Sequence, residues 1–336
     1  MREITINQND AGQRLDKFLT KYLVNMPQSM LYKSLRKNCV RVNGKHIKDG
    51  KYMLQNGDVL KLFFKDEFYE NKSSFKAGNS DIDVVYEDEN IILINKESGV
   101  VVHSDDKGTK DTLLERMQSY LYKKGEYNPE NEHSFSPSFC NRLDRNTSGI
   151  IIGAKNAAAL RIINEKIRSR EIKKIYLCIV EGHLKKSGHL TAYLTRGDKK
   201  VTVSDYHEEN SKKIGTKYNV IAEKKDTSLV EVELETGRTH QIRAQFSHIG
   251  NPLYGDTKYG SRHSGGMKLA SYKLVFDFKT DAGILNYLNH KEFQISVDFA
   301  KTFAQQKLYR SAVAFGLPRC LTLSSIIATR QGQANI

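Results

Sequence analysis

The sequence has no run of about 18 consecutive apolar residues that could cross a membrane, and its start, Met1–Thr5, lacks the apolar centre of a signal peptide. It has only four cysteines, Cys39, Cys140, Cys178 and Cys320, and no pair of them has the spacing of a zinc site. These absences argue against a membrane-spanning helix and a disulfide framework. They predict a soluble, cytoplasmic protein whose cysteines are free thiols.

The motifs of cofactor chemistry are missing as well. The sequence contains neither a glycine-rich loop of the kind that cradles phosphates nor a cluster of metal-ligating residues. It shows no internal repeat. We therefore expect a reaction that needs no nucleotide, redox or metal cofactor.

Acidic residues are few relative to basic ones. Lys and Arg total 53 against 39 Asp and Glu, so the formal charge is +14 and the pI is about 9.4. A basic excess of this size predicts a polyanionic partner. Nucleic acid is the first candidate, and an anionic membrane surface is the weaker second.

The length of 336 residues allows one large domain and one small one. In the small one, residues 1–64, a strand at Glu3–Ile6 precedes a helix whose apolar residues recur at helical spacing up to Leu23. A second helix is expected at Ser29–Lys37. The pair Asn43-Gly44 then predicts a tight hairpin.

Residues 65–80 are polar with little apolar periodicity, which indicates a linker. The large domain, residues 81–308, has many predicted strands and few helices, so we expect an α+β fold on a mixed or antiparallel sheet. The expected strands are 82–86, 91–95, 175–180, 217–222 and 229–235, and the expected helices are 112–122 and 156–170. The last stretch, 301–336, has five basic residues and no acidic one. Its extension 309–336 fits a basic RNA-contacting tail, a helix or a disordered end.

The segment Asn141–Gly149 has the character of an active-site turn. Asp144 lies between Arg142 and Arg145, and nearby positive charge keeps a carboxylate ionised. Short hydroxyl side chains and Gly149 can hold such a turn in one orientation. Taken alone, the pattern also fits a structural, ion-paired Asp.

Three further motifs follow in order: Lys174–Tyr176, Thr236–Arg243 and Gly250–Asp256. Together with Asn141–Gly149, they resemble the RluA-type pseudouridine synthases over about residues 82–301. Residues 13–64 resemble the S4-like RNA-binding domain. The resemblance implies a pseudouridine synthase fold and an enzyme that isomerises uridines in RNA by base flipping, with ribosomal RNA of the large subunit as the expected target. The oligomeric state is open, with a monomer as the default expectation.

The resemblance also implies roles for single residues. Asp144 would be the catalytic residue, as nucleophile or base. Tyr176 would stack on the everted uracil, and its hydroxyl could assist proton removal at carbon 5. Arg243 would hold Asp144 charged and oriented, and Ile242 would pack against the base. Arg142 would enter the RNA stack when the uridine leaves it.

Other positions are expected to support the site. Arg145 would also contact substrate, Gly237 would supply a turn, and His240 would serve as a structural hydrogen-bonding residue. Lys96 and His103 lie in segments that depart from the family pattern, and we expect them to shape the cleft. The basic residues of the small domain are expected to bind RNA phosphates: Lys33, Arg36, Lys37, Arg41 and Lys45.

Two alternatives remain open from the sequence. One is a non-catalytic RNA-binding ribosome assembly factor that kept the fold. The other is a nucleosidase that releases free uracil, although glycoside hydrolysis ordinarily uses two carboxylates and the motif shows one.

Overall fold

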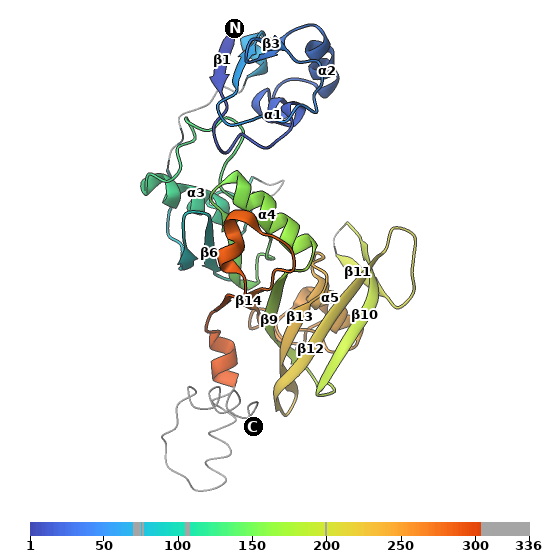
Figure 1. The fold of residues 1–336 in the computed structure, drawn as a ribbon. Helices are drawn as coiled ribbons and strands as arrows, with labels where there is room; N and C mark the ends of the chain where they lie inside the picture. The colour runs from blue at the N-terminus through green and yellow to red at the C-terminus, as the bar shows by residue number, and fades with distance from the viewer. Residues whose placement is uncertain (70–74, 76, 105–107, 199, 304–336) are drawn as a thin grey trace.

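The computed structural model describes residues 1–69, 75, 77–104, 108–198 and 200–303. They form a small N-terminal unit at one end of the molecule and a larger part built on one long sheet (Figure 1). The predicted linker, 65–80, lies partly outside the described residues, and the predicted extension, 309–336, lies wholly outside them.

The N-terminal unit packs two helices on a four-stranded antiparallel sheet. The helices are α1 (Leu15–Tyr22) and α2 (Gln28–Arg36), and the strands in spatial order are β1 (Arg2–Thr5), β4 (Val59–Leu62), β2 (Val40–Val42) and β3 (Lys45–His46). Leu15, Phe18 and Leu19, at the i, i+3 and i+4 positions of α1, are fully buried. Asn43 and Gly44 both have positive φ, 51° and 79°, as the predicted hairpin turn requires.

The larger part contains a single mixed sheet, in agreement with the predicted α+β class. Its strands in spatial order are β11 (Val201–Ser204), β10 (Ser187–Arg196), β12 (Lys212–Lys224), β13 (Thr227–Leu234), β9 (Ile172–Glu181), β14 (Leu269–Phe276), β8 (Ser148–Ala154), β6 (Ile91–Lys96) and β5 (Val84–Glu87). Two short strands are attached at its side, β7 (Ser138–Phe139) to β8 and β15 (Glu292–Gln294) to β14. The neighbours β8 and β14 run parallel, and the other pairs are antiparallel.

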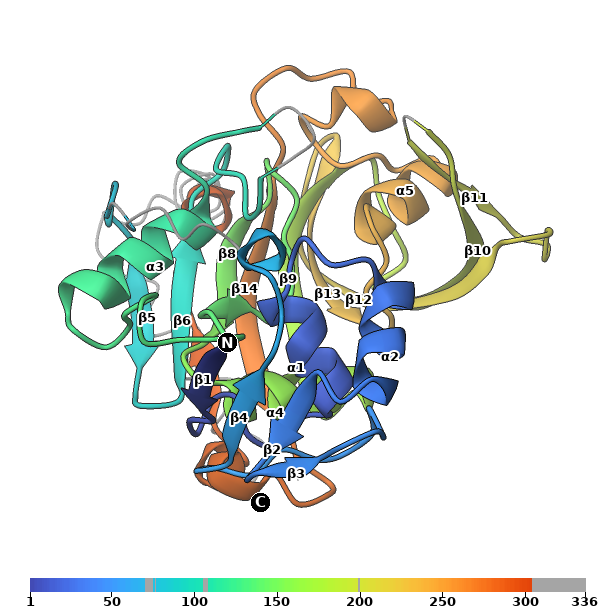
Figure 2. The ribbon, with the colours of Figure 1, turned by 90° about the horizontal axis from the view of Figure 1, so that it is seen from above.

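Helices cover both faces of this sheet. On one face, α3 (Leu113–Lys123) and α5 (Gln241–His248) share a core with β6, β8 and β9. On the other face, α4 (Ala157–Arg168) and the 3-10 segment η3 (Gly283–Leu288) pack against β6, β8 and β14. In the view of Figure 2, the central strands lie between α3 and α5, the two helices of the first face. Two further 3-10 turns are η1 (Asp66–Phe68) and η2 (Thr257–Tyr259).

The two helices predicted in the larger part, α3 and α4, each begin directly after a residue whose side chain caps the helix. Thr112 and Glu115 form a reciprocal capping box at the start of α3, and the Asn156 side chain caps α4. The strands extend further than predicted, with β12 covering Lys212–Lys224 and not only 217–222. The strand begins with the exposed Lys212 and Lys213, and the buried Gly215 and Thr216 that follow are not strongly apolar, so apolar content alone marks only the middle of the strand.

The two parts touch through polar contacts. The Asp10 carboxylate, fully buried, accepts hydrogen bonds from the backbone N and the Oγ of Ser134 at 3.0 and 2.6 Å. Asn9 accepts from the backbone N of Ala157, the first residue of α4, at 3.2 Å. Tyr22 meets the His133 ring edge-on. The N-terminal unit is therefore attached at a defined place on the larger part.

Candidate active site

The turn that carries Asp144 is shaped by the close approach of β8 and β14. Gly149, with φ 108°, lies opposite Ser271, and a Cβ at this glycine would come within 2.2 Å of the Ser271 carbonyl oxygen. Only glycine fits there. The Thr147 N–H donates to the Asp144 carbonyl at 3.0 Å and closes the turn. Asp144 is thus held where two parallel strands meet.

Lys96 supports the same turn. Its side chain is almost fully buried, and its amine donates to the carbonyl oxygens of Glu97, Val100 and Arg145 at 2.8 to 2.9 Å. Burial lowers the pKa of this amine to about 8, against the effect of the Asp144 charge, which raises it. These contacts agree with the shape-setting role expected for Lys96.

Asp144 forms its ion pairs with residues distant in sequence. Arg243 Nη1 donates to Asp144 Oδ2 at 3.0 Å, and His240 Nε2 lies 3.6 Å from the same oxygen. Arg142 and Arg145 lie on the turn itself. Burial lowers the pKa of His103, and the charge of Arg142 lowers it further. The ion pair that orients Asp144 thus comes from α5, as the motif resemblance implied for Arg243.

Arg243 is itself held by a second carboxylate. Its Nε and Nη2 donate to Asp256 at 2.6 and 2.9 Å, and its guanidinium lies 4.9 Å from the centre of the Tyr259 ring. Asp256 and Tyr259 received no role from the sequence. Asp256 is the last residue of the motif Gly250–Asp256. Its position in that motif is the sequence feature that could have identified it as a site residue.

His240 joins these groups. Its Nδ1 is 2.8 Å from the Tyr259 hydroxyl, which agrees with its expected hydrogen-bonding role. Its backbone is left-handed, with φ 55°, immediately before α5. The prediction that Gly237 supplies this turn is wrong, because Gly237 has no positive φ. The missing side chain of Gly237 leaves room for the Lys174 amine, which would be 3.3 Å from a Cβ there.

Tyr176 and Ile242 lie in the core beside Asp144. Tyr176 is 6% exposed and pairs in register with Ser271. Burial raises the pKa of its hydroxyl, and the Asp144 charge raises it further. Ile242 is buried in the same cluster. The structure therefore brings Asp144, Tyr176, Ile242 and Arg243 together.

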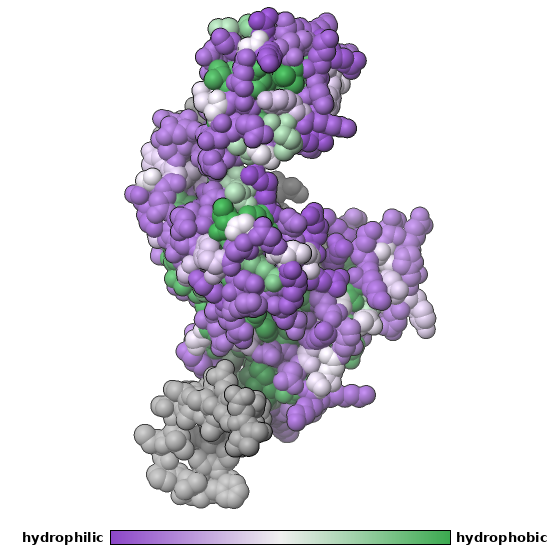
Figure 3. Space-filling model, in the orientation of Figure 1, coloured by the Kyte–Doolittle hydropathy of each residue, from purple (hydrophilic) through white to green (hydrophobic). Residues whose placement is uncertain are grey.

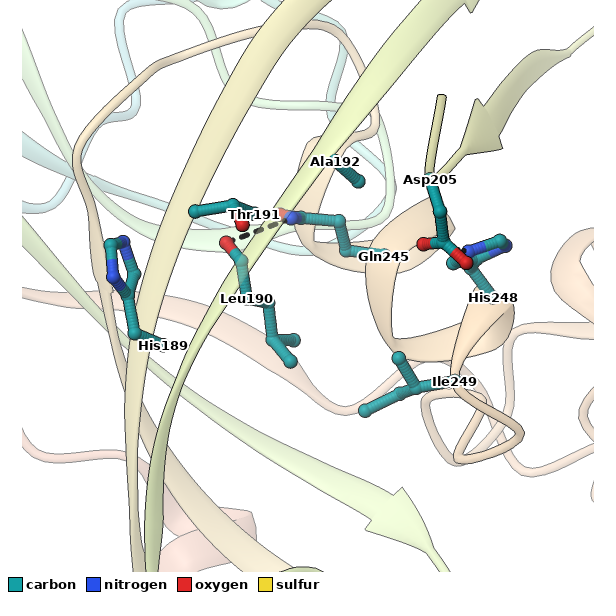
Figure 4. A pocket seen from close by; sticks show the side chains of 8 residues that line it. All are labelled: His189, Leu190, Thr191, Ala192, Asp205, Gln245, His248 and Ile249. Atoms are coloured by element: carbon teal, nitrogen blue, oxygen red, sulfur yellow. Dashed lines mark hydrogen bonds and ion pairs between the residues drawn. The ribbon is translucent and has the colours of Figure 1, made fainter. Parts of the chain in front are cut away.

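A hollow on the opposite side of α5 is separate from this cluster. Gln245, which lies on that side of the helix, donates to the Leu190 carbonyl at 3.2 Å, and His248 pairs with Asp205 at 2.9 Å (Figure 4). The remaining residues that line it are His189, Thr191, Ala192 and Ile249. No predicted site residue lines this hollow.

Two other sequence-based expectations concern absences. Among the described residues, no group of three or more His, Cys, Asp or Glu side chains is placed to hold a metal ion. None of the helices in this part of the chain combines the length and apolarity needed to cross a membrane. Of the cysteines, Cys39, Cys140 and Cys178 are free thiols, and Cys320 lies outside the described residues. Burial raises the pKa of the Cys140 thiol to about 12.

Comparison with known proteins agrees with this geometry. Residues 90–248 match the model of the RNA pseudouridylate synthase family, and residues 13–60 match the S4 domain. An uncharacterized RNA pseudouridine synthase of Mycoplasma capricolum is 30% identical over 87% of this chain and 96% of its own length. The ribosomal large subunit pseudouridine synthase C of Haemophilus influenzae is 32% identical, covering 78% and 80%.

The chain belongs to the RNA pseudouridylate synthase family. It is thus an RNA pseudouridine synthase, an isomerase that converts uridine in RNA to pseudouridine, and the enzyme is favoured over the non-catalytic assembly factor. The human RNA pseudouridylate synthase domain containing 1 shares the fold, with a TM-score of 0.53, 22% identity, and coverage of 68% of this chain and 89% of its own.

Proposed function

We propose that this enzyme modifies large-subunit ribosomal RNA in the cytoplasm, acting as a monomer with Asp144 as its catalytic carboxylate. The observation that carries the proposal is the ion pair of Asp144 with Arg243. It forms on the turn just before β8 begins, close to Tyr176. The target class is supported by relatives named ribosomal large subunit pseudouridine synthase C. Isomerisation conserves every atom and electron of the uridine, so the reaction consumes no oxidant or reductant.

Asp144 fits the role of a group that attacks the ribose or base, or removes a proton. Its side chain is 26% exposed, whereas that of Arg243 is 9% exposed. The carboxylate is thus open to substrate while its cation is shielded. A charge-assisted hydrogen bond from Arg243 fixes the direction of the Asp144 carboxylate, as a nucleophile or base requires.

Arg142 and Arg145 would receive the RNA. Both lie on the turn beside Asp144 and reach solvent. Extruding a uridine from its stack costs a few kcal/mol. A guanidinium that stacks in the gap offsets part of that cost, and the exposed Arg142 would supply it. Tyr176 and Ile242 would contact the everted base.

The N-terminal unit would provide a second RNA-binding surface. The exposed residues on α2 and the following hairpin include Lys33, Arg36, Lys37 and Lys45, with Arg41 half-buried between them. Among the described residues none of these five cations forms an ion pair with an acidic side chain. His46 Nε2 lies 2.8 Å from the Leu35 carbonyl, which holds the hairpin against α2. The surface in Figure 3 is largely hydrophilic over this unit. Unneutralised cations on adjoining elements suit phosphate contacts.

Purified Asp144→Asn protein tests the proposal on large-subunit ribosomal RNA transcripts. We expect no pseudouridine from the variant and an RNA affinity within about twofold of wild type, because the amide keeps the shape and loses the charge. Asp298→Asn, at a fully exposed carboxylate, is the control and should keep full activity.

Three outcomes would contradict the proposal. Pseudouridine formation by Asp144→Asn would reject the catalytic assignment. Modification of transfer RNA with no product on ribosomal RNA would reject the target class. Release of free uracil by the wild-type enzyme would identify a nucleosidase.

A further inference from the structure

Asp256 lies behind the arginine that holds Asp144. The Asp256 side chain is 3% exposed, so it is shielded from solvent more completely than Asp144, and it contacts Arg243 through both of its oxygens. Asp256 Oδ2 accepts from Nε and Oδ1 accepts from Nη2. Arg243 is therefore held by a two-point, charge-assisted contact in a buried environment.

This contact fixes the direction of the guanidinium. A guanidinium is planar, and its N–H groups form a rigid fork. When Nε and Nη2 are bound to one carboxylate, Nη1 can point in only one direction within that plane, and here it donates to Asp144 at 3.0 Å. The Tyr259 ring lies 4.9 Å from the guanidinium carbon and limits movement out of the plane.

The backbone around Asp256 is fixed in turn. The Asp256 carbonyl accepts hydrogen bonds from the backbone N–H groups of Tyr259 and Ser261 at 3.0 and 3.1 Å. The preceding Gly255 has φ 80°, and a Cβ there would come within 2.1 Å of the Gly266 carbonyl oxygen. Asp256 thus stands on a tightly packed turn that cannot easily follow a displaced arginine.

We propose that Asp256 is a positioning residue for the isomerisation: it aims Arg243 Nη1 at Asp144. The proposal rests on the assignment of Asp144 as the catalytic carboxylate. Because the Asp256 side chain is only 3% exposed, we expect it to act on the rate through Arg243 and to leave RNA affinity unchanged.

Asp256→Asn tests this role, because the amide is isosteric and uncharged. Single-turnover rates at saturating RNA should fall at least tenfold, whereas the dissociation constant for RNA should stay within twofold of wild type.

A purely structural role would lower the thermal midpoint and leave the single-turnover rate of the folded enzyme at the wild-type value, and such a rate in Asp256→Asn would overturn the proposal. If that variant does not fold, Asp256→Glu keeps the charge but displaces it by one methylene. It should show the same loss of rate with unchanged RNA affinity, and a wild-type rate would overturn the proposal.

The two assignments can fail separately. An active Asp144→Asn enzyme would remove the catalytic assignment whatever Asp256 does. An inactive Asp144→Asn enzyme together with a fully active Asp256→Asn enzyme would remove only the positioning role. Asp298→Asn controls for the loss of an ordinary surface carboxylate.

Discussion

Tyr176 shows how one residue can serve two purposes at the site. Its ring belongs to the core shared by β9 and α5, and its backbone pairs with that of Ser271 on β14. Because burial and the Asp144 charge raise the pKa of the hydroxyl, it is protonated at neutral pH. A protonated hydroxyl cannot take the proton from carbon 5, so Tyr176 would first have to give up its own proton.

Tyr176→Phe separates the ring from the hydroxyl. The ring is kept, so RNA affinity should not change. The rate of pseudouridine formation should fall by about 10²–10⁴, the usual effect of losing an acid–base group. Single-turnover kinetics on a uridine stem-loop would measure this, with Tyr206→Phe at an exposed site as the control. A wild-type rate in Tyr176→Phe would restrict the residue to stacking.

At the scale of elements, the site depends on how closely β8 and β14 approach. These two are the parallel neighbours within a largely antiparallel sheet, and the Asp144 turn enters β8 at the point where they begin to pair. On the other side, Gln241 and Gln245 anchor α5 to β12 through Thr216, at 2.9 and 2.5 Å. The approach of β8 and β14 positions Asp144, and the attachment of α5 to β12 positions Arg243.

Gly149→Ala should disturb the close approach of β8 and β14. The added Cβ would meet the Ser271 carbonyl oxygen, and the positive φ is itself unfavourable for alanine. Strain of this kind costs about 1–3 kcal/mol before the clash is counted, so both the unfolding free energy and the isomerisation rate should fall. Denaturant unfolding and activity assays would show this.

Gly265→Ala is the matched control, since a Cβ there meets only the Tyr254 ring at 3.7 Å. It should be close to wild type in both measurements. A fully active Gly149→Ala enzyme would show that Asp144 tolerates movement of its strand.

At the scale of the whole molecule, the N-terminal unit has its own core and meets the larger part through polar groups such as Asp10 and Ser134. The buried core of the N-terminal unit has no residue in common with the cores of the larger part, so we expect each part to keep its fold without the other. The larger part contains every residue of the proposed catalytic site. We therefore expect the N-terminal unit to add affinity for a large RNA and to leave the chemistry unchanged.

A triple variant with Lys33, Arg36 and Lys37 changed to Ala tests this division. Its affinity for ribosomal RNA should fall, and the slope of log affinity against log salt should decrease by about 0.7–0.9 for each phosphate that the variant no longer binds. Its rate at saturating concentration of a short stem-loop should stay at the wild-type value. Filter binding over a salt series and single-turnover assays would measure the two effects.

Lys61→Ala is the control, because the Lys61 amine is already paired with Glu3 at 3.1 Å. Loss of stem-loop turnover in the triple variant, with its fold intact, would place these cations in the catalytic step.

The sequence by itself determined the residue types of the site, the helices and the RNA partner. Asp144, Tyr176 and Arg243 were predicted from motifs, and α3 and α4 from caps and periodicity, because such signals are local. The tertiary structure decided the pairing of Asp144 with Arg243, 99 residues later in the chain, and the clamp by Asp256. It also placed a left-handed residue, His240, immediately before α5, a conformation that the sequence did not predict. These features arise where sheet and helix pack together, and no local preference encodes which distant side chains then meet.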